Sequence, residues 1–200
     1  MSGFVRPFSL AFFRAAALGP RVGCRVRGLW ITLRLRAIGG QVGRRLTAAP
    51  GVRIVTAPGA VWRVGDNVTL GSGVLIFVRA GARLDLGDDV RIMHYAIIGV
   101  EQHITMDDHA QVGEHGTVRD HDHDVTASCL FTAPPVCAPV HIGADAWLGC
   151  GVATLRGTTI GAGAVIGANA VVRGDIPARA IAVGAPARVV RFRDTELTRS

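Results

Sequence analysis

Aliphatic residues recur every six positions through the second half of the chain, and most of them are followed by glycine. The clearest series is Ile142, Leu148, Thr154, Ile160, Ile166 and Val172. This period matches neither that of an α-helix nor that of a continuous strand. The chain must therefore turn a corner once in each hexad, which is typical of a parallel β-helix.

The same pattern extends upstream in runs of three hexads. The runs are Val64, Leu70 and Ile76; Leu86, Ile92 and Ile98; Met106, Val112 and Val118; Ile142, Leu148 and Thr154; and Ile160, Ile166 and Val172. Three hexads predict a three-sided coil, and five runs predict about five coils. Extra residues enter only after the third side, so we expect all insertions to leave the helix at one corner.

These spacings predict an all-β protein in three parts. Residues 1–63 form an N-terminal extension, residues 64–177 form the β-helix, and residues 178–200 form a tail. The longest insertion is a loop over residues 119–141, which contains His121 and His123. A disordered chain rich in glycine and alanine would not keep its aliphatic residues in register.

The charge of the chain is concentrated near its N-terminus. The net charge is +7, and residues 1–65 contain eleven arginines and no acidic residue. Phe4, Phe8 and Phe12 would share one helix face, and an apolar run from Leu29 to Leu35 lies among further arginines. Two interpretations stay open: a cap over the first coil, or a segment (residues 1–45) in peripheral contact with an anionic membrane surface. No stacking platform or groove-reading motif supports a nucleic-acid partner.

The cellular compartment is predicted from the apolar N-terminal stretch and from the cysteines. Arg6 and Arg14 interrupt the apolar stretch from Phe4 to Leu18, which predicts neither a spanning helix nor a signal peptide. The four cysteines have neither the spacing of a zinc ribbon nor that of a disulfide framework. We therefore expect a cytoplasmic protein.

The C-terminal segments carry a recognisable motif. Pro139 to Gly149 reads PVHIGADAWLG, residues 160–167 read IGAGAVIG, and residues 184–191 read GAPARVVR. This pattern resembles the hexapeptide-repeat acetyltransferases, and among them the maltose, galactoside and polysaccharide O-acetyltransferases. The resemblance covers about residues 64–191. It implies a left-handed β-helix, a homotrimer with active sites at the subunit interfaces, and acetyl-CoA as donor.

The resemblance places the catalytic base in the loop before the motif. The family histidine lies five residues after an aliphatic inward position and about sixteen before the proline, and His123 meets both spacings from Val118 and Pro139. His121 is the second candidate. An imidazole with a pKa near ~6.5 can take the proton of a sugar hydroxyl as it attacks a thioester. The nearby Asp120, Asp122 and Asp124 would either orient the ring or form a solvated acidic loop.

Further site residues follow from the same resemblance. It assigns Trp147, Gly149 and Cys150, with Ala168 one coil further, to the groove for the pantetheine arm of the donor. The arginines available for its phosphates are Arg173, Arg188 and Arg191. The candidates for acceptor binding are Met93, His94 and His103. Galactoside-type relatives have an asparagine near Met93 and His94, so their sugar preference is not carried over.

Two other functions compete with acetyl transfer. Because His103 and His123 each lie five residues after a third-side inward position, we expect them to stack one rung apart, at about 5 Å. Together with His94, His109, His115 and His121 they keep open a zinc enzyme similar to the γ-type carbonic anhydrases. The spacing does not reproduce that family's ligand pattern, and no metal is expected. A non-catalytic trimeric scaffold is the third class.

The favoured prediction is a cytoplasmic acetyl-CoA-dependent O-acetyltransferase. The expected acceptor is a sugar hydroxyl in surface polysaccharide or in a lipid-linked glycan, with the enzyme at the inner membrane face. Amine acceptors and longer acyl donors stay open.

Overall fold

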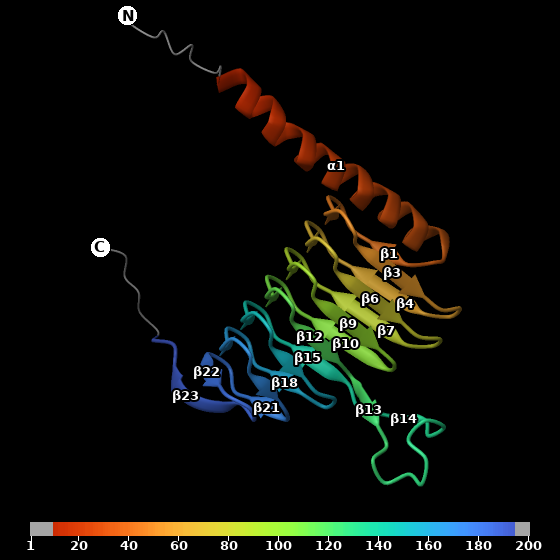
Figure 1. The fold of residues 1–200 in the computed structure, drawn as a ribbon, viewed down its shortest axis with the longest axis vertical. Coiled ribbons are helices and arrows are strands. Elements are labelled where there is room, and N and C mark those ends of the chain that lie inside the picture. The colour runs from red at the N-terminus through yellow and green to blue at the C-terminus, as the bar shows by residue number, and fades with distance from the viewer. Residues whose placement is uncertain (1–9, 195–200) are drawn as a thin grey trace, which may run out of the picture.

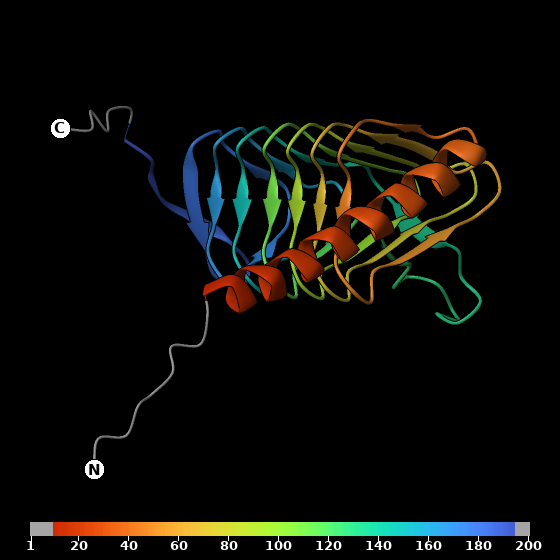
Figure 2. The same cartoon turned by 90° about the horizontal axis from the view of Figure 1, so that it is seen from above.

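The computed structural model describes residues 10–194, with side chains described for residues 21–194. One helix, α1 (Leu10–Ala37), precedes a parallel β-helix with three flat faces (Figures 1 and 2). The all-β class and the solenoid architecture predicted from the hexads are confirmed.

Each face is one parallel sheet, built from one strand of every coil. The first face contains β1 (Gln41–Val42), β4 (Val61–Val64), β7 (Arg83–Leu86), β10 (His103–Met106), β15 (Val140–Ile142), β18 (Thr159–Ile160) and β21 (Asp175–Ile176). The second face contains β2 (Thr47–Ala48), β5 (Thr69–Leu70), β8 (Arg91–Ile92), β11 (Gln111–Val112), β16 (Trp147–Leu148), β19 (Val165–Ile166) and β22 (Ala180–Val183), and β23 (Arg188–Phe192) joins it antiparallel to β22. The third face contains β3 (Arg53–Thr56), β6 (Leu75–Val78), β9 (Ile97–Val100), β12 (Thr117–Arg119), β17 (Ala153–Thr154) and β20 (Val171–Val172).

The predicted inward positions form the core. All fifteen are buried, from Val64 at 7% exposed to Ile166 and Val172 at 0%. Identical positions stack coil upon coil, as in the register Val118↔Thr154↔Val172 on the third face. Aliphatic ladders of this kind bury apolar surface continuously along the solenoid, which is the main stabilising term of the fold. Thr154 is the polar member of these ladders, and its buried hydroxyl has no hydrogen-bond partner among the described residues.

The solenoid has six complete coils, one more than the five predicted. The additional coil is the first, β1 to β3, and it lies within residues 1–63. Its inward residues Val42 and Ala48 are buried, and Ile54 packs against the core, so the hexad pattern continues upstream of Val64. The prediction missed this coil because Ala48 is small and the flanking arginines hide the aliphatic period.

Helix α1 lies across the first coil (Figure 1). Leu35 and Thr32 are buried against the coil, and Thr32 donates its hydroxyl hydrogen to the Gly28 carbonyl. A Cβ atom on Gly28 would lie 1.9 Å from the Leu46 carbonyl oxygen, so only glycine allows this close approach. This is the arrangement expected of a cap. Phe4 and Phe8 lie outside the described residues, and the Phe12 side chain is not described.

Helix α1 does not have the character of a transmembrane segment. Within residues 10–194, no helix combines the length and the hydropathy that crossing a bilayer requires.

The long insertion leaves the β-helix at the corner between the third and first faces. After β12 the chain forms an antiparallel hairpin of β13 (His121–His123) and β14 (Pro135–Cys137), then rejoins the first face at β15 (Figure 1). This is the corner at which the sequence predicted the insertions. We call it the loop corner, and we call the corner between the second and third faces the turn corner.

Candidate active site

Asp120 fixes the base of the insertion to the preceding coil. Its side chain is completely buried, and its carboxylate accepts backbone N–H hydrogen bonds from Glu101, Gln102 and His103 at 2.7–2.8 Å. The backbone carbonyl of Asp120 accepts a hydrogen bond from the N–H of Ala138 at 2.9 Å, at the far end of the hairpin. One residue therefore holds both ends of the insertion.

His121 is packed into this base. Its Nδ1 atom lies 3.1 Å from Asp120 Oδ1, and its side chain is 14% exposed. The ring packs edge-on against Phe77, with ring centroids 6.0 Å apart. Buried on one side and paired with a carboxylate, His121 has the contacts of a residue that holds the loop.

His123 lines a pocket of about 400 Å³ beside the insertion. The other lining residues are Asp122, Val125, Leu155, Arg156 and Arg173. The Arg156 side chain donates to Asp122 at 3.1 Å, which holds that wall of the pocket. His123 is exposed, as a base that must reach a substrate has to be.

The three candidate aspartates have separate partners. Asp120 pairs with His121, and Asp122 pairs with Arg156. Asp124 accepts hydrogen bonds from the hydroxyl and N–H of Thr126, which lower the pKa of this carboxyl. Of the three, Asp120 is the one that contacts a candidate base, His121.

His103 does not stack on His123, and that prediction is wrong. His103 lies on β10 opposite Arg83 of β7, whereas His123 leaves the coil on the β13–β14 hairpin. On the first face His103 Nε2 lies 2.8 Å from Asp85 Oδ2, and Arg83 Nε donates to both oxygens of Asp85. Burial alone would raise the pKa of Asp85, but the hydrogen bonds from Arg83 and His103 outweigh it and hold the pKa below its ordinary value.

A second group of predicted residues gathers at the turn corner. Trp147 is 53% exposed on β16, and Cys150 is exposed at the turn that follows it. A Cβ atom on Gly149 would lie 2.8 Å from the Ala168 nitrogen, so the two turns stack closely.

Met93 and His94 lie at the turn corner too, several coils away from Ala168. His94 Nδ1 accepts the backbone N–H of Ser72 at 2.9 Å. One residue further, Tyr95 stacks on His115 with ring centroids 5.4 Å apart. The acceptor-binding candidates are therefore divided, because His103 lies on the first face beside the loop corner.

The three predicted arginines are also divided. Arg173 lines the pocket beside His123. Arg191 lies on β23 in register with Trp147, through Val165 and Ile181 of the strands between them. Three strand spacings separate Trp147 from Arg191, about 14 Å. Arg188 lies on the same strand opposite Val183, where its Nη1 donates to the Ala187 carbonyl.

Three pocket residues, Val125, Leu155 and Arg156, were not predicted from the sequence. Leu155 and Arg156 lie one and two positions after the inward residue Thr154, as Arg119 and Asp120 do after Val118 in the preceding coil. These positions follow the third face, so the hexad register places Leu155 and Arg156 at the loop corner.

The histidines do not form a metal site in the described part of the chain. Within residues 10–194, no three or more His, Cys, Asp or Glu side chains come together in a group able to hold a metal. His94 and His115 lie at the turn corner, His109 faces Asp89, and His103 and His121 are each paired with an aspartate.

Comparisons with known proteins agree with the repeat pattern. Residues 139–174 match the family described as bacterial transferase hexapeptide (six repeats). A probable acetyltransferase from Mycobacterium tuberculosis is 62% identical over 56 residues, which are 28% of this chain and 19% of that protein. The chain spans about a fifth to a third of the length of the first curated relatives it matches.

Two solved structures are similar over most of the solenoid. A hexapeptide-repeat acetyltransferase from Vibrio cholerae, solved in complex with acetyl coenzyme A, has a TM-score of 0.61 and 27% identity over 66% of this chain and 72% of its own. A maltose O-acetyltransferase from Clostridium difficile has a TM-score of 0.60 and 27% identity over 66% of this chain and 70% of its own. The predicted resemblance to hexapeptide-repeat acetyltransferases is confirmed.

Proposed function

We propose that this chain is an acetyl-CoA-dependent O-acetyltransferase that uses His123 as its general base. The observation that carries the proposal is the pocket beside His123, on a β-helix similar to that of an acetyltransferase solved with acetyl coenzyme A. The pocket combines an exposed imidazole with the cations Arg156 and Arg173. This is the chemistry needed to deprotonate an alcohol next to an anionic donor.

His123 would take one proton from the acceptor and later give it to the leaving group. The imidazole takes the proton of the acceptor hydroxyl as its oxygen attacks the thioester carbonyl, which forms a tetrahedral intermediate. When the C–S bond breaks, the imidazolium returns the proton to the departing thiolate. The products are an acetyl ester and free coenzyme A. Backbone N–H groups near the loop corner would stabilise the oxyanion.

We propose that the working unit is a homotrimer. Within one chain, His123 lies at the loop corner, whereas Trp147, Cys150 and Ala168 lie at the turn corner on a different edge of the prism. A cyclic trimer would bring the loop corner of one subunit against the turn corner of the next. Each active site would then take its base from one subunit and its donor groove, with Arg188 and Arg191, from the neighbour.

The acceptor that we propose is a sugar. A sugar hydroxyl is favoured by the similarity to a maltose O-acetyltransferase. The basic N-terminal segment suits a surface polysaccharide or lipid-linked glycan, modified in the cytoplasm at the inner face of a membrane, with peripheral contact through residues 1–45.

An acceptor screen with acetyl-labelled acetyl-CoA tests this function. We expect transfer of label to at least one neutral saccharide, and release of that label by alkali, because the bond formed is an ester. If label is found only in alkali-stable amides of amino sugars, the acceptor group is an amine and the hydroxyl acceptor is wrong. No transfer, combined with zinc-dependent bicarbonate formation, would favour the carbonic-anhydrase alternative.

A further inference from the structure

Helix α1 carries an apolar surface that no other element of the described chain covers. Val22, Val26, Leu29 and Leu33 are each between 56% and 61% exposed. Their spacing of three and four residues places them on one face of the helix, which we call the outer ridge. The opposite face, with Gly28, Thr32 and Leu35, packs on the first coil.

Arginines border the outer ridge on both sides. By helical position, Arg25 and Arg36 lie along one side and Arg27 and Arg34 along the other. Two of the four also contact the first coil, because Arg27 donates to the Ala48 carbonyl and Arg36 donates to the Val42 carbonyl. On the first side, a groove of about 730 Å³ separates α1 from the coil, and Arg44 and Arg45 also line it. Asp66 pairs with Arg44 at 3.4 Å, which leaves this basic groove with more positive than negative groups.

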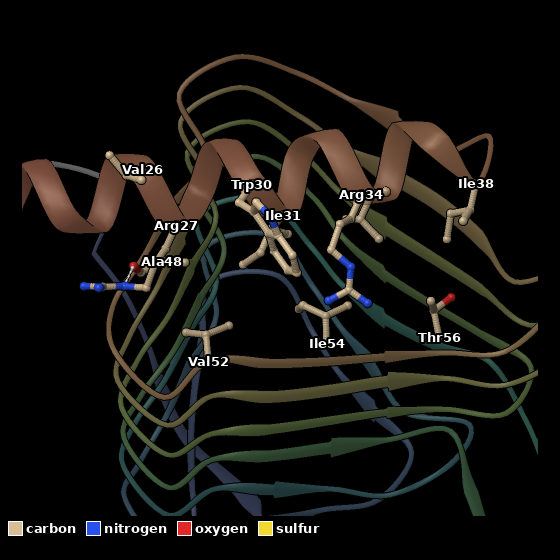
Figure 3. A pocket seen from close by; sticks show the side chains of 11 residues that line it. Val26, Arg27, Trp30, Ile31, Arg34, Ile38, Ala48, Val52, Ile54 and Thr56 are labelled. Atoms are coloured by element: carbon tan, nitrogen blue, oxygen red, sulfur yellow. Dashed lines mark hydrogen bonds between the residues drawn. The ribbon is translucent and has the colours of Figure 1, made fainter.

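The second side of the helix has an apolar groove. It encloses about 440 Å³ between α1 and β3, and Trp30, Ile31, Val52 and Ile54 line it (Figure 3). The Trp30 ring borders both this groove and the outer ridge. The Arg34 guanidinium lies over that ring, 4.6 Å from its centroid. An aromatic ring next to a cation is a frequent arrangement at the boundary between lipid headgroups and acyl chains.

We propose that the outer ridge of α1 is a membrane-docking surface for bilayers that contain anionic phospholipids. The ridge inserts its aliphatic side chains between the lipid headgroups, and the bordering arginines contact the phosphates. The largest cluster of these arginines lines the basic groove along α1. This inference deepens the peripheral membrane contact proposed above by naming its surface. It depends on the helix face alone, so acetyl transfer and lipid binding can fail separately.

The charge pattern favours a bilayer over a second copy of this chain. Residues 1–65 contain no acidic residue, so two ridges packed together would bring arginines against arginines. An anionic bilayer neutralises the same arginines while it covers the apolar side chains. A nucleic-acid backbone would neutralise the arginines but leave the ridge between them in water.

Vesicle sedimentation of the full-length protein tests the surface. We expect binding to vesicles of phosphatidylcholine with phosphatidylglycerol, weak binding to phosphatidylcholine alone, and loss of binding in high salt. The double variant Leu29→Asp/Leu33→Asp should weaken the binding at least tenfold, and Arg25→Glu/Arg34→Glu should do the same. Binding should also shift the tryptophan emission to the blue, and Trp30→Phe should remove that shift.

Two matched controls distinguish binding through the outer ridge from nonspecific binding through any exposed apolar or basic residue. Phe131→Asp changes a 96% exposed apolar residue in the insertion, and Arg91→Glu reverses an exposed arginine on β8. Both should bind vesicles like the wild type. Equal losses in these controls, undiminished binding of the ridge variants, or absence of wild-type binding would each overturn the proposal. Lipid-free association between trimers that Leu29→Asp abolishes would assign the ridge to a second copy instead.

Discussion

The Asp120 carboxylate accepts the backbone N–H of His103 at 2.7 Å, and this contact ties the base of the insertion to the coil before it. The same carboxylate binds the N–H groups of Glu101 and Gln102, so a buried charge is solvated entirely by backbone amides and His121. A loop held this firmly at its base can present His123 at a fixed place while its tip stays exposed.

Asp120→Asn should therefore destabilise the protein. The amide group replaces one acceptor oxygen by a donor that faces backbone N–H groups, which leaves at least one buried N–H without a partner. We expect the free energy of unfolding to fall by about 2–4 kcal/mol, measured by urea denaturation. Asp122→Asn is the control: its ion pair with Arg156 is partly exposed, and its loss should cost less than about 1 kcal/mol. Equal effects of the two changes would contradict the role given to Asp120.

Substitution of the two loop histidines should have different consequences. His123→Ala should lower turnover by about 10²–10⁴-fold and leave acetyl-CoA affinity unchanged, because it removes the base without touching the donor groove. His121→Ala should act mainly through loop stability, since this ring packs on Phe77 and pairs with Asp120. Steady-state rates at saturating donor distinguish them. The full loss in His121→Ala, with turnover retained in His123→Ala, would exchange their roles.

Thr154→Val should stabilise the β-helix. The hydroxyl of Thr154 is buried in the aliphatic ladder without a partner, and valine replaces it with a methyl group of similar shape. Removing an unsatisfied buried hydroxyl should raise the free energy of unfolding by about 1 kcal/mol. Thr158→Val provides the contrast, because the equally buried Thr158 hydroxyl donates to the Val172 carbonyl at 3.2 Å. Thermal unfolding should move upward for the first variant and downward for the second.

Gly28→Ala tests the contact between α1 and the first coil. The added methyl group would collide with the Leu46 carbonyl, so the helix must move away from the coil and uncover Leu35. We expect a lower melting temperature and faster proteolysis within residues 21–40. Gly23→Ala, on the same helix, meets only the guanidinium end of the Arg27 side chain and should be neutral or slightly stabilising. An unchanged Gly28→Ala protein would show that α1 does not pack as described.

The hexad period was sufficient to predict the core and the corner of the insertion. Residues such as Ile98 and Val118 must point inward once per side, and no competing periodicity disturbs them. The first coil was missed because its period is carried by Val42, Ala48 and Ile54, which are weaker markers among arginines.

Side-chain partners were harder to predict than backbone positions. His103 and His123 occupy equivalent places in the sequence, but the insertion turns into a hairpin at Asp120 and takes His123 off the coil. The cause is the buried Asp120 carboxylate, whose hydrogen bonds with residues 101–103 depend on the three-dimensional approach of two coils. Periodicity contains no information about such a contact.

The most direct test of the account is a calorimetric titration of acetyl-CoA into the metal-free protein. It requires no knowledge of the acceptor, and it separates an acetyl-CoA enzyme from a scaffold and from a zinc enzyme. We expect saturable binding in the micromolar range with one site per subunit, and weaker binding after Arg191→Ala. The absence of detectable binding by the folded wild-type protein would contradict it.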